Sequence, residues 1–257
     1  MEITGFTVEL LSFLLIASFV AGFLDTLAGG GGLIALPALM MAGIPPLSAL
    51  GTNKLQGTMG TATATYMMLK NRRVSWVDVK FLMLAAFIGA VMGTIAVQFI
   101  NTELLVFVIP AVLLLIAVYF LLSPLPQMGI TKARVSKGKY QKIIVPLIGW
   151  YDGMFGPGTG SFFALAGVSL QGHGLIDATA VAKTLNFSTN IASLMVFLLA
   201  GKVVWLVGLI MMVGQFAGAW GGSQCLFRIN PKYLRLIVVT MCLAMLTKYA
   251  FSSGWIA

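Results

Sequence analysis

Two aspartates and two lysines carry most of the chemistry that this sequence offers within its apolar segments. Asp25 and Asp152 each follow a long apolar stretch and precede a glycine-rich segment, and Lys54 and Lys183 follow them by 29 and 31 residues. The aspartates are 127 residues apart and the lysines 129, so a gap of two residues aligns two halves of the chain. A charge within apolar sequence of this kind costs about 2.5–3.5 kcal/mol on insertion scales and needs a partner or a wet cavity. The pattern therefore predicts a charged site built twice.

Each lysine has amide neighbours that could help it to hold a small oxyanion. Asn53 and Gln56 flank Lys54, while Asn186 and Asn190 lie three and seven residues after Lys183, on the same face of a helix. Ammonium and amide groups together bind oxyanions through charge-assisted hydrogen bonds. The alternative is that each lysine lies near a helix end and extends to the lipid headgroups.

The glycine-rich segments offer backbone donors to the same kind of ligand. Glycine allows close approach to backbone N–H groups, and a helix that begins just after the cluster directs its positive end to the same point. We expect such helix starts at Leu33 and Ser161. Close helix packing through small residues is the alternative explanation. The candidate substrate-binding residues of these segments are Gly31, Gly32, Gly158, Thr159, Gly160 and Ser161.

The role of the two aspartates stays open between two alternatives. An aspartate four residues before a glycine cluster can accept hydrogen bonds from loop amides, or cap the helix that follows. It can also carry a coupling proton or contact the substrate, because an ionisable group within a membrane usually has a function. Repetition of Asp25 as Asp152 fits both alternatives.

The surrounding sequence is typical of an integral membrane protein. Hydrophobic residues make up 59% of the chain and charged ones 9%, with a mean hydropathy of +0.99, whereas soluble domains carry about 25% charged residues. Segments apolar on every side, without period-2 alternation, predict an all-α protein with about eight transmembrane helices. The apolar segments 33–43 and 160–171 are too short to cross a bilayer. Each follows a glycine cluster, as broken or re-entrant helices do at transporter binding sites.

The chain divides into two homologous repeats, 1–122 and 141–257, joined by a basic, proline-containing linker at 123–140. Basic residues also gather at 70–73. Two clear spans separate these loops, so both lie on one side, which we take as cytoplasmic. Net charge of +9 is explained by such loops, without nucleic acid as a partner. Whether the repeats are parallel or inverted depends on the short segments, and the oligomeric state is not predicted.

With these residues assembled, the chain resembles the TauE/SafE sulfite exporter family of membrane permeases. The resemblance covers essentially the whole chain, and its motifs lie at 22–33, 36–37, 49–56, 151–161 and 182–187. It implies a permease of the bacterial inner membrane with about seven to eight spans. It also implies that the substrate is sulfite, an organosulfonate or a related small anion.

The sequence therefore predicts a secondary transporter for a small anion that works by alternating access. A passive anion channel with the same architecture is the alternative. An enzyme is not expected, because the single histidine lies in a loop and no nucleophile, metal or cofactor motif accompanies it. Neither is ATP hydrolysis within the chain, because it has no phosphate-binding GK[ST] motif.

Overall fold

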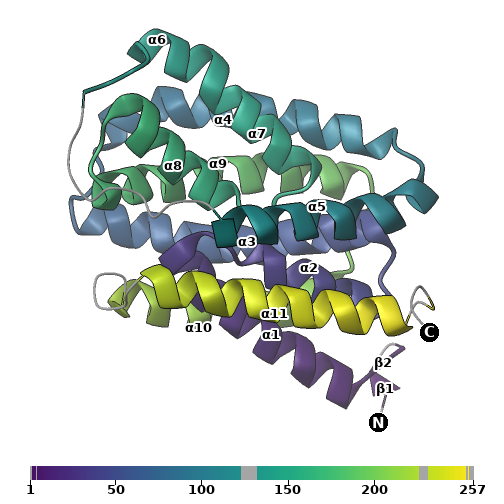
Figure 1. Cartoon of the computed structure of the whole chain (residues 1–257). Coiled ribbons are helices and arrows are strands. Elements are labelled where there is room, and N and C mark those ends of the chain that lie inside the picture. Colours follow the sequence, from purple (N-terminus) through teal and green to yellow (C-terminus); the bar gives the residue numbers. More distant parts are fainter. Residues whose placement is uncertain (1, 4, 123–131, 226–230, 253, 255–257) are drawn as a thin grey trace.

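The structure, a computed structural model, describes residues 2–3, 5–122, 132–225, 231–252 and 254, and the described chain is almost wholly helical (Figure 1). The continuous run of α6, η1 (a π-helical stretch) and α7 makes ten helical segments in this part of the chain. Two-residue strands β1 (Glu2–Ile3) and β2 (Phe6–Thr7) form a small antiparallel pair before the first helix. The helices are α1 (Val8–Ala28), α2 (Gly32–Met41), α3 (Pro46–Lys70), α4 (Trp76–Gln98), α5 (Thr102–Leu122), α6 (Lys137–Lys139), η1 (Tyr140–Ile144), α7 (Val145–Met154), α8 (Thr159–Gln171), α9 (Leu175–Leu199), α10 (Trp205–Cys225) and α11 (Pro231–Ser252).

Membrane-spanning capacity is clearest in four of the described helices. The segments Val8–Leu27, Trp76–Gln98, Thr102–Leu122 and Trp205–Cys225 are long and apolar enough to cross a bilayer by length and composition. Helices α3 and α9 have 25 residues each, which is about 37 Å at the usual rise. Their sequences are less apolar because they carry buried polar side chains. The short segments expected at 33–43 and 160–171 are the helices α2 and α8.

The expected linker at 123–140 is only partly described. Residues 123–131 lie outside the described part of the chain. At the other end, the linker residues Lys137 to Lys139 are already helical, and that helix runs on to Met154. Ser136 caps its start, because its side chain accepts a hydrogen bond from the Lys139 backbone N–H.

Glycines break the chain at two corresponding places. Helix α1 ends at Gly29, whose φ is +74°, and α2 begins three residues later. Helix α7 ends before Gly156 and Gly158, whose φ values are +97° and +79°, and α8 begins at Thr159. Residues with side chains rarely adopt these conformations, so the glycines are what allow the chain to turn here. The helix starts lie one and two residues before the expected Leu33 and Ser161.

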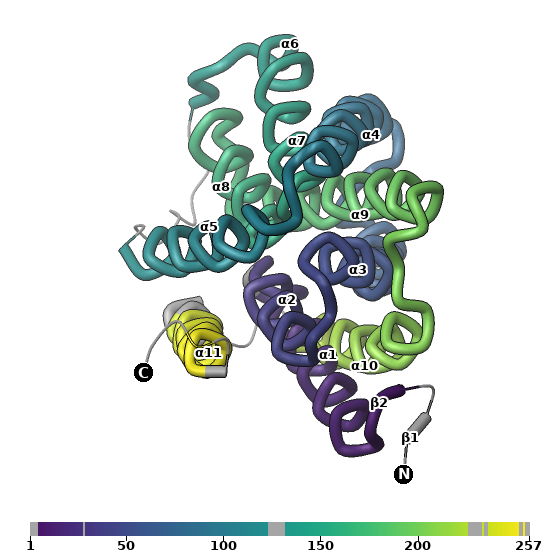
Figure 2. Tube along the Cα trace, turned by 90° about the vertical axis from the view of Figure 1, so that its right-hand side faces the viewer, coloured from purple at the N-terminus to yellow at the C-terminus, as the bar shows by residue number. Residues whose placement is uncertain are grey.

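The two halves of the chain pass through the bundle in opposite directions. Strand β1 and the end of α11 lie at one end of the molecule, whereas the α3–α4 connection and α6 lie at the other (Figure 1). Helices α3 and α9 are antiparallel: the Thr65 hydroxyl donates to the Lys183 carbonyl, and Gly51, near the start of α3, contacts the Lys202 carbonyl after α9. Seen along the helices in Figure 2, α3 and α9 occupy the centre, between α4, α7 and α8 on one side and α1, α2 and α10 on the other.

Helices of one half pack along helices of the other through glycines. Helix α1 lies along α10, and α7 lies along α4. A side chain at Gly218 would overlap the Phe19 carbonyl, and one at Gly93 would overlap the Trp150 carbonyl. Both contacts therefore need glycine, as close helix packing in membranes generally does. Phe19 corresponds to Pro146 by the 127-residue offset, and Gly89 corresponds to Gly218 by the 129-residue offset. The corresponding contact, between Gly89 and the Pro146 carbonyl, is also present.

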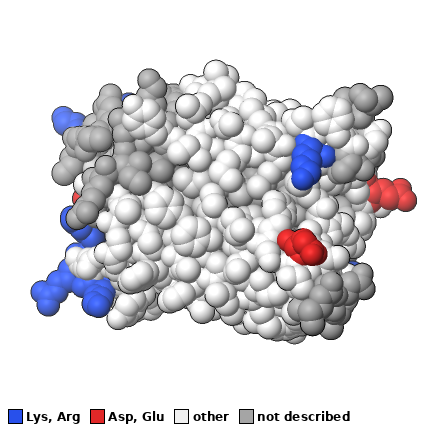
Figure 3. Space-filling view, turned by 90° about the horizontal axis from the view of Figure 1, so that it is seen from below, with Lys and Arg blue, Asp and Glu red and all other residues white. Residues whose placement is uncertain are grey.

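Charged side chains are few on the face that Figure 3 presents, and none lies at its centre. Lys and Arg side chains gather at one end, and a broad uncharged band covers the middle. Large apolar side chains are exposed on several helices of the bundle, among them Phe81, Ile88, Met92, Leu115 and Phe216. Such a surface suits contact with lipid.

Replacing Gly93 or Gly218 by alanine should destabilise the protein. The added methyl group meets a backbone carbonyl that cannot move without separating two helices, and overpacking of this kind costs about 1–3 kcal/mol. Thermal unfolding of the purified protein in detergent measures the effect. Gly138→Ala is the matched control, since a Cβ there meets nothing within 4 Å. Equal unfolding temperatures for all three variants and the wild type would contradict this packing.

Candidate substrate site

The aspartates and lysines of the two halves form two crossed ion pairs. Lys54 of α3 pairs with Asp152 of α7, its Nζ lying 2.9 Å from the carboxylate Oδ1. Lys183 of α9 pairs with Asp25 of α1, with 3.5 Å from Nζ to Oδ2. Each lysine thus reaches the aspartate of the other half. Both lysines are buried, with 1% of each residue exposed, so neither extends to the lipid headgroups.

Both aspartates also brace the glycine turns that follow them. The backbone N–H of Gly31 donates to Asp25 Oδ1 over 3.2 Å. The Thr159 hydroxyl, at the start of α8, donates to Asp152 Oδ1 over 2.8 Å. These bonds hold the end of one helix against the start of the next. The loop-bracing geometry considered from the sequence is therefore present at both sites, together with an ion pair.

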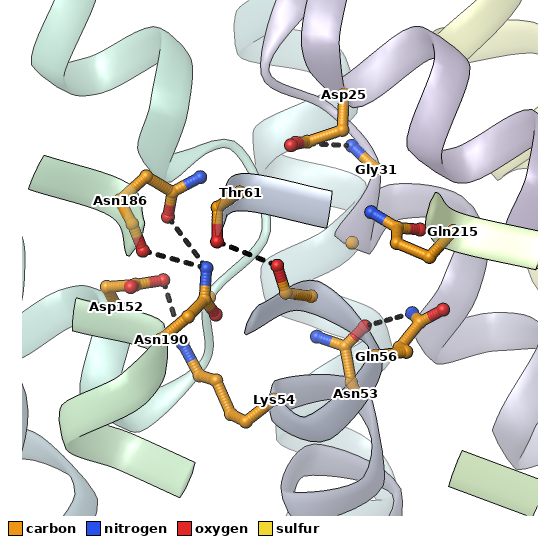
Figure 4. Close-up of a pocket in the computed structure, with 13 residues that line it drawn as sticks. Asp25, Gly31, Asn53, Lys54, Gln56, Thr61, Asp152, Asn186, Asn190 and Gln215 are labelled. Atoms are coloured by element: carbon orange, nitrogen blue, oxygen red, sulfur yellow. Dashed lines mark hydrogen bonds and ion pairs between the residues drawn. The ribbon is translucent and has the colours of Figure 1, made fainter. Parts of the chain in front are cut away.

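A small polar cavity lies between the two pairs, at about the middle of α3 and α9. Its volume is about 30 Å³, which is room for about two water molecules. Figure 4 shows Asp152, Asn186 and Asn190 on one side and Gln56 and Gln215 on the other. The lining residues are Asp25, Gly31, Gly32, Asn53, Lys54, Gln56, Gly57, Thr61, Asp152, Gly156, Asn186, Asn190 and Gln215.

Several polar atoms at this site lack a partner among the described residues. The Lys54 ammonium has no contact with hydrogen-bond geometry, although Asp152 lies beside it, and the second carboxylate oxygen, Asp152 Oδ2, accepts none. Gln56 donates from Nε2 to Asn53 Oδ1 over 2.9 Å, which leaves its Oε1 unpartnered. Gln215 Oε1 is buried and unpartnered as well. Buried polar atoms are normally satisfied, so water or a polar ligand is needed here.

The cavity brings together many of the residues singled out in the sequence. Nine of them line it: Asp25, Gly31, Gly32, Asn53, Lys54, Gln56, Asp152, Asn186 and Asn190. Lys183, Gly158, Thr159, Gly160 and Ser161 do not line it. Lys183 and Gly160 lie just behind: a Cβ on Gly160 would lie 3.5 Å from Lys183 Nζ and 3.4 Å from Asn186 Nδ2.

Four lining residues escaped the sequence analysis as site residues. Gly57 and Thr61 continue the face of α3 that carries Lys54, and helical spacing alone could have identified them. Gly156 belongs to the second glycine cluster. Gln215 had no such signal, because it lies in an apolar helix far from the lysines in sequence. Packing of α10 against α1 and α3 brings it to the cavity, where its backbone contacts Gly22 and its side chain lies against Gly60.

A helical protein with apolar flanks and a buried charged cavity between broken helices belongs, as a class, to the membrane transporters. Comparison with known proteins agrees. Residues 14–249 match the family described as "Sulfite exporter TauE/SafE", and the chain belongs to this family. It is a family of transporters and not of enzymes.

Relatives of similar length carry transporter descriptions. The chain is 41% identical to a "Probable membrane transporter protein" of Haemophilus influenzae, over 96% of this chain and 97% of that one. It is 44% identical to "Probable membrane transporter protein ORF9" of Sinorhizobium sp, covering 92% and 91%. It is 40% identical to "Probable membrane transporter protein YfcA" of Escherichia coli K12, covering 95% and 91%. No solved structure matches the chain significantly.

Substitution of Lys183 by methionine should destabilise the protein, because it leaves the Asp25 carboxylate buried without its cation. Loss of one partner of a buried pair costs about 3–5 kcal/mol. The double variant Lys183→Met/Asp25→Asn should recover part of that loss, since asparagine needs no counter-charge. Thermal unfolding in detergent compares them, with the exposed Lys137→Met as control. Unfolding of Lys183→Met at the wild-type temperature would show that the pair contributes nothing.

Proposed function

We propose that this protein is a secondary transporter that moves a small anion, such as sulfite, an organosulfonate or a related sulfur-containing anion, across the bacterial inner membrane. The observation that carries the proposal is the Lys54 ammonium at a buried polar cavity, without hydrogen-bond partners among the described residues. A small oxyanion would satisfy it. The amides of Asn53, Gln56, Asn186 and Asn190 would orient the anion, and backbone N–H groups at Gly31 and Gly32 would add donors.

The architecture that we propose for transport is a pair of inverted repeats, residues 1–122 and 141–257. Three features support it: the opposite directions of the two halves, the crossed ion pairs, and the glycine contacts related by the same offsets. In this arrangement eight longer helical segments span or enter the membrane. The short helices α2 and α8 return from the glycine turns towards the sides from which α1 and α7 enter.

Alternating access follows from that arrangement. The cavity lies where the halves meet, so a tilt of one half against the other would open it first to one side and then to the other. The cavity holds about 30 Å³, so in this conformation it is not an open anion pathway, as alternating access requires of a closed state. The basic loops beside α3 and α6 would face the cytoplasm.

Counterflow in proteoliposomes tests this function. Vesicles loaded with sulfite, sulfate, thiosulfate, sulfoacetate or a simple carboxylate are given the same labelled anion outside. We expect saturable exchange of at least one sulfur-containing anion. Unsaturable, ohmic current would instead identify a channel. Absence of both exchange and current for every anion would overturn the proposed function.

Lys54→Ala should abolish this exchange, with flux reduced at least about 100-fold, because a charge-assisted hydrogen bond to an anion contributes about 1.5–3 kcal/mol and a buried cation adds to it. Lys80→Ala removes an exposed lysine of α4 and serves as the control. Both variants must elute as folded protein on size exclusion before flux is compared. Wild-type flux in folded Lys54→Ala protein would show that the transported anion does not bind to Lys54 in this cavity.

A further inference from the structure

The two ion pairs, although related by the sequence offsets, differ in how their lysines are held. Lys183 Nζ donates to the backbone carbonyl of Asp25 as well as approaching its carboxylate. That carbonyl also accepts from the Gly29 N–H and belongs to the last turn of α1. A lysine at the C-terminal end of a helix stabilises the carbonyls that the helix leaves free. Lys183 is therefore tied to the backbone of the first glycine turn, behind the cavity.

Lys54 has no such backbone partner in the part of the chain that the structure describes. Its ammonium borders the cavity and contacts Asp152 Oδ1 only as an ion pair, without hydrogen-bond geometry. The two carboxylate oxygens of Asp152 have different surroundings. Oδ1 accepts a hydrogen bond from the Thr159 hydroxyl and lies beside the Lys54 ammonium, whereas Oδ2 is buried and accepts no hydrogen bond from a described residue. This pair thus has a cation that can accept a new partner and a carboxylate oxygen that can accept a proton.

The charge balance of the cavity limits what can enter. At the cavity, Lys54 and Asp152 together carry no net charge, so a monovalent anion that bound to the Lys54 ammonium would leave the Asp152 carboxylate buried and uncompensated. Such a charge is costly away from water. One proton delivered with the anion restores neutrality.

We propose that the pair Lys54–Asp152 is the site of coupling, and that it exchanges partners in each transport cycle. This inference rests on the proposed function. The incoming anion binds to the Lys54 ammonium in place of Asp152. Asp152 accepts one proton at Oδ2 from water on the side to which the cavity is then open. The Thr159 hydroxyl continues to donate to Oδ1. One proton then travels with each monovalent anion, in the same direction, and both leave on the far side.

Other charged groups around Asp152 are few and do not replace it in this role. Across the cavity lies Asp25 of α1, with Lys183 of α9 behind it. These two residues form an ion pair, and Asp25 also accepts a hydrogen bond from the first glycine turn. The charged residues of α4, Asp78 and Lys80, are exposed at the end of the bundle, as is Lys142 of η1, and α8 contains no charged residue. Tyr151 directs its hydroxyl to the Pro157 carbonyl.

The test compares Asp152→Asn with its counterpart Asp25→Asn. Anion affinity is measured as the concentration that half-saturates counterflow between pH 5.5 and 8, with ethanesulfonate and sulfite as probes. If one proton binds with each anion, the half-saturating concentration in the wild type should rise by up to about tenfold per pH unit as the pH rises. Asp152→Asn should still exchange anion but with a slope set only by the titration of the probe. Asp25→Asn should keep the wild-type slope while unfolding at a lower temperature.

A second readout is proton movement, followed with a pH-sensitive dye inside the vesicles. Uptake driven by an anion gradient should acidify vesicles containing wild type or Asp25→Asn, but not Asp152→Asn. Because both variants meet the same probe, the difference between their slopes is independent of the chemistry of the anion. Equal slopes in the two variants, or a wild type that binds an anion without pH dependence or proton movement, would overturn the coupling while leaving the proposed function intact. Absence of exchange for every anion in the wild type would overturn both.

Discussion

Charge buried within a membrane protein must be neutralised nearby, and here that constraint joins the two halves of the chain. Neither Asp25 nor Asp152 has its cation in its own half, because the lysines that pair with them come from α9 and α3. The halves must therefore assemble before the charges are satisfied. A buried pair is weak evidence for net stability, but breaking one is costly. The crossed pairs thus favour a single arrangement of the broken helices.

The glycine turns depend on the same constraint. Each aspartate lies at the end of a helix that stops at residues with positive φ, and each holds the turn that follows through Gly31 N–H or the Thr159 hydroxyl. Close glycine contacts between α1 and α10, and between α7 and α4, bring these turns to the centre of the bundle. Packing, turn geometry and electrostatics therefore converge on one cavity, which is the arrangement that a transport site between half-units requires.

The sequence predicted the helices and much of the cavity, because both depend on local patterns. Apolar runs located the helices, glycine clusters located the breaks, and the spacing of Asn186 and Asn190 after Lys183 indicated one face of α9. It could not predict which aspartate pairs with which lysine, since that depends on contacts between helices far apart in the chain. For the same reason the sequence does not indicate Gln215. The two lysines are alike in sequence, and they differ in the structure because only Lys183 donates to a described backbone carbonyl, that of Asp25.

We propose that an oxyanion binds to Lys54 in the cavity between the crossed pairs. An experimental structure of the protein with selenite, a heavier anion of the sulfite type, tests it most directly, because anomalous scattering locates selenium. We expect a selenium peak beside the Lys54 ammonium, between Gln56 and Gln215, with Asp152 no longer the nearest partner of that lysine. A peak at another place, with Lys54 still on Asp152, would contradict it.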